Sequence, residues 1–452
     1  MKKYTYHYHV IIWDCIKSEI LLLGDNVYRL PHFARCECSL WSDASIVNSG
    51  IHDLFGMDFI TLRCLRLEPQ EQSGEMHFFY AGVPRNLNWQ PPSNSRWIHE
   101  TDIDDIDLEV SLHWVILREW FSWLADTTHR HIRVPWFEAG WFHSAESWFI
   151  DQLSDMGFRA NSPVEQLRSC QRSSILRVKT DQARVYMKAI PLVFAHEPVV
   201  SSLLAMQYPD NITPILAYDP VHHWFLMPDL GVEDLSASPD IEKWSEAMNL
   251  YARIQISTMD RVDELLSIGC PDRRPDIVST QMTALLADSS AMQPDDSLCS
   301  FTDDEVIKIN ELVPELSRMC SRLYDYNVPF TIEHGDLWAG QVMVQGDNII
   351  FTDWSDCSIS HPFFSLYKYL LNEKMEQNMP NEHGVLERLM EAYLEPWTEF
   401  EPMNRLLELF QISGRIAGLH FALMYYQRIL PGMEIKWENH RMLPYHLREA
   451  IS

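Results

Sequence analysis

The sequence has few glycines, few cations relative to its acids and no long apolar run. Its 16 glycines in 452 residues are about half the usual share near 7%, which disfavours a function that depends on repeated glycine-rich loops. Lys and Arg number 36 against 64 Asp and Glu, for a net charge of −28. This balance argues against the broad basic face that a binder of phosphate backbones needs, so nucleic acid and anionic membranes are poor partners.

Targeting and redox signals are also absent. No window approaches 18 uncharged apolar residues, so no transmembrane helix is expected. The segment Met1–Val10 lacks the apolar stretch of a secretory signal. The nine cysteines are scattered, and the closest pair, Cys36 and Cys38, lacks the C-x-x-C spacing of metal or redox sites. The expected location is therefore cytoplasmic, with reduced thiols.

The length and the 46% hydrophobic content predict at least two packed domains. Alternating apolar residues predict strands, and longer amphipathic stretches predict helices. In the first part of the chain we expect strands at 6–13, 19–23, 59–67 and 75–82, with helices at 45–55 and 108–125. The first helix stops at Gly56, a plausible C-cap. This pattern predicts a small α+β domain over residues 1–150.

A polar loop at 155–163 separates this domain from a second one, predicted over residues 160–452. Strands are expected at 174–178, 184–189 and 223–227, and helices dominate from Ile241 onward, interrupted by short strands at 342–344 and 349–352. The second domain should therefore have a small β-rich lobe at about 160–230 and a helical lobe at about 231–452. The fold class of the whole chain is α+β.

The most informative segment runs from Phe330 to Trp354. It contains an acid, Asp336, an amide, Gln341, five residues later, and a strand hairpin that ends at a second acid, Asp353. Phosphoryl transfer requires such a set: one carboxylate accepts the proton of the attacking hydroxyl, while an amide oxygen and another carboxylate hold magnesium. Each motif alone is compatible with a simple turn or strand end, but their order and spacing favour a catalytic site.

These motifs resemble the aminoglycoside phosphotransferase and choline kinase superfamily, which has a protein-kinase-like bilobal phosphotransferase fold. His334-Gly-Asp336 matches its catalytic H-G-D, Thr352-Asp-Trp354 resembles its metal-binding I-D-W, and Leu337–Gly340 is similar to the fructosamine-kinase branch. Two positions depart from the family: Gln341 stands where Asn is usual, and Ser365 where Asp is common. The resemblance implies Asp336 as catalytic base, Gln341 and Asp353 as Mg²⁺ ligands, and ATP as the phosphoryl donor.

A kinase site also needs a lysine on a small-lobe strand, paired with a helix carboxylate. Lys188, in Val185–Ala189, and Glu197, near the start of the next helix, have this arrangement. A surface lysine and a first-turn glutamate favoured by the helix dipole are the alternative. The segment 169–174 occupies the place of a phosphate-covering loop but has no glycine, so Arg172 and Ser173 are weaker nucleotide-binding candidates, and a plain surface turn is equally compatible.

The segment Trp224–Gly231 resembles the strand and hinge that hold adenine in the family. The candidate adenine-binding residues are Met227, Pro228, Asp229 and Leu230, although Met and Leu here are equally compatible with ordinary core positions.

The first domain resembles a Nudix fold. The stretch that corresponds to the Nudix catalytic helix, Asn48–Gly56, lacks the clustered glutamates that bind metal for diphosphate hydrolysis, and only Asp53 could ligate a metal. The resemblance therefore implies a noncatalytic Nudix-like domain.

We thus expect an ATP- and Mg²⁺-dependent transferase that moves the γ-phosphoryl group to a hydroxyl of a small molecule, such as an aminoglycoside, sugar or amino alcohol. The acidic charge favours a cationic acceptor. Three alternatives remain open: a nucleotide-binding pseudokinase that acts as a scaffold, a Nudix-type hydrolase and a protein kinase. The last is disfavoured because no D-F-G or A-P-E segment surrounds Asp353. The oligomeric state is not predicted.

Overall fold

A computed structural model describes residues 5–36, 40–70, 73–86, 88–292, 300–366 and 384–450. The chain divides into two compact units, Met1–Pro191 and Leu192–Ser452. The predicted border at 150–160 falls inside the first unit, and the assignment of the two parts to a Nudix-like and a phosphotransferase domain stays a prediction. Helices and strands are both plentiful, so the α+β class is confirmed.

A mixed six-stranded sheet organises the first unit. Its path is β5-β6-β1-β2-β7, and β4 pairs with β1. The strands are β1 (Thr5–Asp14), β2 (Glu19–Leu23), β4 (His32–Arg35), β5 (Phe59–Gln70), β6 (Glu75–Pro84) and β7 (Ser95–His99), and a separate parallel pair is formed by β3 (Val27–Tyr28) and β8 (Asp107–Leu108). The predicted hairpin of β1 and β2 is confirmed, whereas β1 and β6 run parallel.

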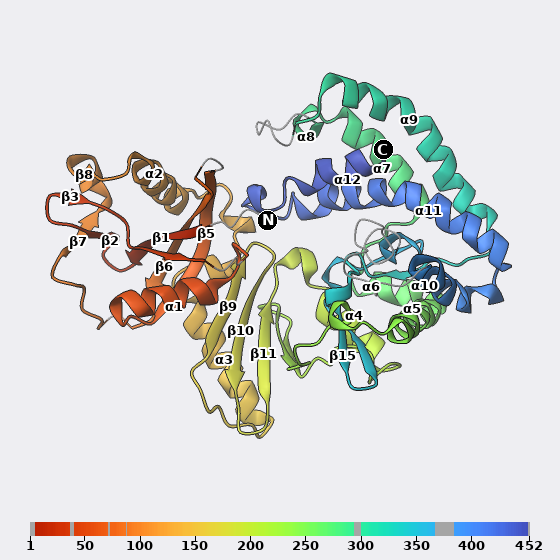
Figure 1. Cartoon of the computed structure of the whole chain (residues 1–452), viewed down its shortest axis with the longest axis horizontal. Helices are drawn as coiled ribbons and strands as arrows, with labels where there is room; N and C mark the ends of the chain where they lie inside the picture. The colour runs from red at the N-terminus through yellow and green to blue at the C-terminus, as the bar shows by residue number, and fades with distance from the viewer. Residues whose placement is uncertain are drawn as a thin grey trace. The chain divides into compact units, whose positions relative to one another are not determined.

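Two helices cover opposite faces of this sheet (Figure 1). Side chains alternate between the faces along β1, so Tyr8 points to one face and His9 to the other. Helix α1 (Ala44–Phe55) brings Gly50 against Phe33, whose ring stacks on Tyr8. Helix α2 (Ser111–Ala125) brings His113 to His9. Gly56 caps α1 with φ 60°, as predicted, while α2 begins at Ser111 instead of Leu108.

Helix α3 (Trp141–Asp155) leads to the antiparallel strands β9 (Glu165–Cys170), β10 (Ser173–Lys179) and β11 (Arg184–Ala189). Strand β9 was not expected, and the predicted loop at 169–174 is corrected to two strand ends joined by Gln171 and Arg172.

Strand β9 is fastened to β5 by buried polar side chains. The Gln166 amide accepts a hydrogen bond from Thr61 N and donates one to Thr61 O, and the Ser169 hydroxyl donates to Leu62 O. Hydrogen bonding therefore holds β9 in place where sequence patterns would look for apolar burial.

The second unit is mainly helical. Its helices are α4 (Glu197–Ala205), α5 (Ile241–Ile256), α6 (Val262–Ser267), α7 (Pro275–Ala287), α8 (Ser289–Met292), α9 (Asp303–Arg322), α10 (Val385–Leu394), α11 (Met403–Met424) and α12 (Met442–Ala450). Three antiparallel pairs accompany them: β12 (Ala217–Asp219) with β13 (Trp224–Pro228), β14 (Thr331–Glu333) with β17 (Ser358–Ser360), and β15 (Val342–Gln345) with β16 (Asn348–Phe351). Among the described residues, no helix is long and apolar enough to cross a membrane.

Candidate active site

The His334-Gly-Asp336 motif forms a tight bend directly after β14. Gly335 has φ 84°, a conformation that side chains disfavour. A Cβ atom on Gly335 would lie 2.1 Å from the backbone oxygen of Asp356. Only glycine therefore lets the loop pass this close to the chain that follows Asp353, and the bend places Asp336 at the exit of the loop.

His334 joins the two sequence motifs. Its side chain is fully buried, its Nε2 lies 2.9 Å from the carbonyl oxygen of Thr352, and its ring lies 4.6 Å from that of Trp354. The backbone amide of His334 donates to the hydroxyl of Tyr251, at 3.1 Å. Because a carbonyl oxygen can only accept, Nε2 of His334 carries the proton. The histidine is thus a structural link that holds the loop of Asp336 against the strand end of Asp353.

The β15–β16 hairpin brings Gln341 back to this junction. Val342 pairs with Phe351, and the next backbone bond runs from Thr352 N to Gln341 O at 2.9 Å. The Gln341 side chain then reaches the loop, because its Nε2 lies 3.5 Å from Oδ2 of Asp336. Its Oε1 accepts from the Thr352 hydroxyl at 3.2 Å. The predicted acid and amide therefore meet in space.

Asp353 lies one residue beyond this contact. It adopts the left-handed conformation, with φ 57° and ψ 65°, immediately before the short 3-10 helix η9 (Trp354–Asp356). Non-glycine residues with positive φ are uncommon, and such conformations concentrate at functional sites. Asp336, Gln341 and Asp353 are all half-buried, and carboxylate and amide oxygens are of the kind that Mg²⁺ prefers.

A buried polar network supports the loop from below. The amide of Gly335 donates to the Ser365 hydroxyl at 2.8 Å, and the Ser365 amide donates to Oε1 of Glu333 at 2.9 Å. Burial raises the pKa of Glu333 to about 7. Ser365, which stands where the resembled family commonly has Asp, thus contacts the backbone of the His334–Asp336 loop. We expect acceptor selectivity in the helical regions at about 240–300 and 365–450, of which 293–299 and 367–383 lie outside the described residues.

Two supporting residues, Glu333 and Tyr251, were missed by sequence reasoning. Glu333 immediately precedes the His-Gly-Asp motif, and its burial could have been suspected from the apolar residues around it. Tyr251 is 83 positions from His334 in the sequence, and no local pattern indicates their contact.

Glu197 is the first residue of α4 and is 3% exposed. Helix α4 packs against η9, the helix that follows Asp353. Lys188 lies on β11 of the first unit and is 6% exposed. Its pairing with Glu197 stays a prediction.

The remaining nucleotide candidates occupy both units. Ser173 is 2% exposed and Arg172 half-buried in the turn between β9 and β10. The four proposed adenine-binding residues, Met227, Pro228, Asp229 and Leu230, end β13 and begin the following segment, all half-buried. That segment runs onto the hairpin of Gln341, where Val344 N donates to Glu233 O at 2.9 Å. The hinge candidates and the β15–β16 hairpin are therefore connected within the second unit.

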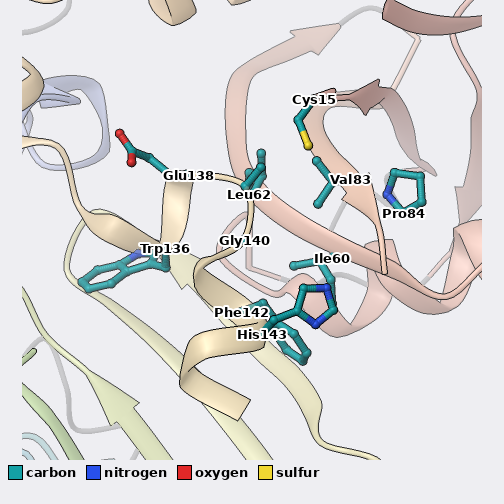
Figure 2. Close-up of a pocket in the computed structure, with 11 residues that line it drawn as sticks. Cys15, Ile60, Leu62, Val83, Pro84, Trp136, Glu138, Gly140, Phe142 and His143 are labelled. Carbon is teal, nitrogen blue, oxygen red and sulfur yellow. The ribbon is translucent and has the colours of Figure 1, made fainter. Parts of the chain in front are cut away.

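Asp53, the one possible metal ligand of the Nudix-like helix, forms a surface ion pair with Arg35 at 2.7 Å. The first unit also contains a cavity of about 150 Å³ (Figure 2). Side chains from β5, β6 and the start of α3 line it, and they are mainly apolar, among them Ile60, Val83 and Phe142. Neither the ion pair with Arg35 nor the lining of this cavity brings a second metal ligand to Asp53. The Nudix resemblance stays a prediction.

Comparisons with known proteins give structural matches only. No family model and no curated protein sequence matches the chain. Among solved structures it is similar to a macrolide 2'-phosphotransferase from Brachybacterium faecium, with 14% identity over 67% of this chain and 97% of that chain and a TM-score of 0.44. An ethanolamine kinase from Plasmodium vivax matches at 16% identity over 64% and 81%, with a TM-score of 0.46. A choline kinase from Streptococcus pneumoniae matches at 12% over 68% and 99%, with 0.45.

By their names, these proteins are one phosphotransferase and two kinases. The identities lie below 25% and the TM-scores below 0.5, so the matches carry no argument about the activity of this chain.

Proposed function

We propose that the chain transfers the γ-phosphoryl group of ATP to a hydroxyl group of a small molecule, with Mg²⁺ as the metal. The observation that carries this proposal is the meeting of Asp336 with Gln341, one residue from the turn of Asp353. Phosphoryl transfer passes through a loose transition state, so positioning and charge stabilisation supply most of the rate. The fixed loop and hairpin are suited to that task.

Asp336 acts as the base in this proposal. Its carboxylate accepts the proton of the acceptor hydroxyl as the new O–P bond forms and the bond from the γ-phosphorus to the bridging oxygen of ADP breaks. The close approach at Gly335 and the His334 hydrogen bond to Thr352 hold the loop, so the carboxylate does not need to be reoriented before reaction.

Gln341 and Asp353 hold the metal, which when bound neutralises charge on the β- and γ-phosphates. The Gln341 Oε1 atom now accepts from the Thr352 hydroxyl, but that hydroxyl lies equally far, 3.2 Å, from the Gln341 carbonyl oxygen. The Thr352 hydroxyl can therefore donate to the Gln341 carbonyl oxygen when Oε1 binds the metal instead. The extra methylene of Gln relative to Asn gives the amide this reach.

We assign ATP binding to Lys188 with Glu197 at the phosphates, Met227–Leu230 at the adenine, and Arg172 with Ser173 as further phosphate contacts. The acceptor is a small molecule with a free hydroxyl, and its predicted cationic character rests on the charge of the second unit. Residues 192–452 contain 40 Asp and Glu against 17 Lys and Arg, a net charge of −23, and an acidic surface attracts cations.

The test is ATP turnover with Mg²⁺ against a panel of aminoglycosides, sugars and choline-like alcohols. Asp336→Asn should lower acceptor-dependent kcat by about 100-fold or more, the range typical of a general base. Asp353→Asn should raise the Mg²⁺ concentration needed for half-maximal rate. Asp347→Asn is a matched control, because Asp347 is an exposed acid at the tip of the same hairpin, and it should leave both quantities unchanged.

Tight nucleotide binding without transfer to any acceptor, in both the native protein and Asp336→Asn, would instead support the pseudokinase scaffold. Release of a nucleoside monophosphate from a dinucleotide, lost in Asp53→Asn, would support a Nudix-type hydrolase. Unchanged transfer and magnesium dependence in Asp353→Asn would contradict the metal assignment.

A further inference from the structure

Five histidines from four elements meet on one face of the sheet in the first unit. We call His7, His9, His32, His77 and His113 the histidine cluster. His7 lies opposite His77 in the parallel pairing of β1 with β6, and His9 lies opposite His32 in the antiparallel pairing of β1 with β4. Neighbouring rings lie 4.6 to 5.3 Å apart, and α2 adds His113.

The edge of the cluster at His7 and His77 also contains a carboxylate. Glu75 precedes His77 by two residues on β6, so their side chains share a face. Its two oxygens lie 3.7 Å from Nε2 of His7 and 3.9 Å from Nε2 of His77. One ligand atom from each of the three residues lies within 4.8 Å of the others. Zinc bonds to histidine and carboxylate are about 2.0–2.2 Å and four-coordinate zinc is tetrahedral, which places ligand atoms about 3.3–3.6 Å apart. The two contacts of Glu75 are a few tenths of an ångström longer than this, so small side-chain movements would let one ion bridge them.

The two imidazole nitrogens that face Glu75 form no hydrogen bond in the described part of the chain. Nε2 of His7 and Nε2 of His77 are shielded from solvent and have no hydrogen-bond partner among the described residues. Buried polar atoms normally find a partner, and an ion between them would supply one.

The opposite nitrogens are held as they are in histidine metal sites. Nδ1 of His7 lies 3.0 Å from His32 Nε2, and Nδ1 of His77 lies 3.0 Å from His9 Nε2. Ligand histidines commonly donate their second ring N–H in this way, which fixes the tautomer and the ring orientation. The series extends from His9 to His113 at 3.3 Å. The Leu30 amide lies 3.5 Å from His113 Nδ1, a long contact that would need this nitrogen to accept instead of carrying the proton.

We propose that His7, Glu75 and His77 bind one divalent ion of the zinc class. Two imidazoles and one carboxylate select such an ion over Mg²⁺ or Ca²⁺, which take oxygen ligands. Three protein ligands leave a fourth position for water or a ligand, as in zinc sites with an open coordination position. The site is separate from the proposed magnesium ligands Gln341 and Asp353, and its failure would leave the phosphotransferase proposal intact.

The experiment uses the full chain without a histidine tag, stripped with a chelator and then equilibrated with Zn²⁺ or Co²⁺. We expect one tightly bound equivalent per chain and, with Co²⁺, the strong visible absorption of a four-coordinate ion. His77→Ala and Glu75→Gln should each weaken binding at least 100-fold, and His9→Gln should weaken it by about 10- to 100-fold, the range for an outer partner. His129→Ala is the matched control, because His129 is an exposed histidine of the same unit that contacts Asp126.

Glu75→Gln changes no volume, so a loss of affinity in that variant together with an unchanged circular dichroism spectrum separates ligation from misfolding. No tight equivalent in the native chain would overturn the site. Equal affinity in His77→Ala and His129→Ala would also overturn it, because binding would then come from scattered surface histidines.

Discussion

Replacement of Gly335 by Ala should strongly destabilise the second unit, and the magnitude follows from two separate effects. The left-handed conformation at φ 84° costs an L-residue about 1–2 kcal/mol. The new Cβ would also lie 2.1 Å from the backbone oxygen of Asp356, and because that atom belongs to the main chain it cannot rotate away. Crowding of this kind costs about 1–3 kcal/mol. The total loss of unfolding free energy should be about 2–5 kcal/mol.

Gly346→Ala provides the control for the first effect. Gly346, at the tip of the β15–β16 hairpin, also has positive φ, 62°, but an added Cβ there would meet no atom within 4 Å. It should therefore cost only about 1–2 kcal/mol. Urea unfolding followed by tryptophan fluorescence measures the unfolding free energy of both variants, and hydrogen exchange of the Ile332 amide provides a second measurement near the loop. Equal destabilisation by the two substitutions would refute the close approach of the loop to Asp356.

Three further substitutions test the buried polar contacts. Because the pKa of Glu333 is about 7 in the folded chain against 4.5 ordinarily, its stabilising contribution is full below pH 4.5 and is lost as the pH rises to 7, by about 3 kcal/mol. In Glu333→Gln, the unfolding free energy measured with urea should change less between pH 4.5 and pH 7 than in the native chain. Equal changes with pH in the two proteins would contradict the raised pKa of Glu333. Ser365→Ala should cost about 1–3 kcal/mol in the same assay, since the buried Gly335 amide loses its acceptor; no loss would mean that another group accepts this bond. Gln166→Ala should cost a similar amount by removing both bonds to Thr61, and amide exchange at Thr61 should accelerate.

Much of the proposed active site could be predicted because its residues lie close together in the sequence. The order of Asp336, Gln341 and Asp353 and the apolar strands between them predict a hairpin, and the structure confirms that this hairpin returns Thr352 to Gln341. The spacing could not show that Tyr251 accepts a bond from His334, since such contacts depend on how distant segments pack.

Two features of the first unit were missed for different physical reasons. Strand β9 buries Gln166 and Ser169 at 4% and 2% exposure, and hydrogen bonding stabilises them where the alternation rule expects apolar residues. The histidine cluster follows from a parallel pairing of β1 with β6 across some 70 residues. The alternation of Tyr and His in Tyr6–His9 is a local signal of this cluster, but it does not show which distant histidines the sheet brings beside it.

The central claim is that Asp336 is the base of a phosphoryl transfer. The most direct measurement follows ADP release from ATP and Mg²⁺ with each acceptor of the panel, in native protein, Asp336→Asn and Asp347→Asn. We predict acceptor-dependent ADP release that Asp336→Asn lowers by about 100-fold or more, while nucleotide affinity is retained and Asp347→Asn matches the native chain. Acceptor-dependent transfer at the native rate in Asp336→Asn would contradict the claim.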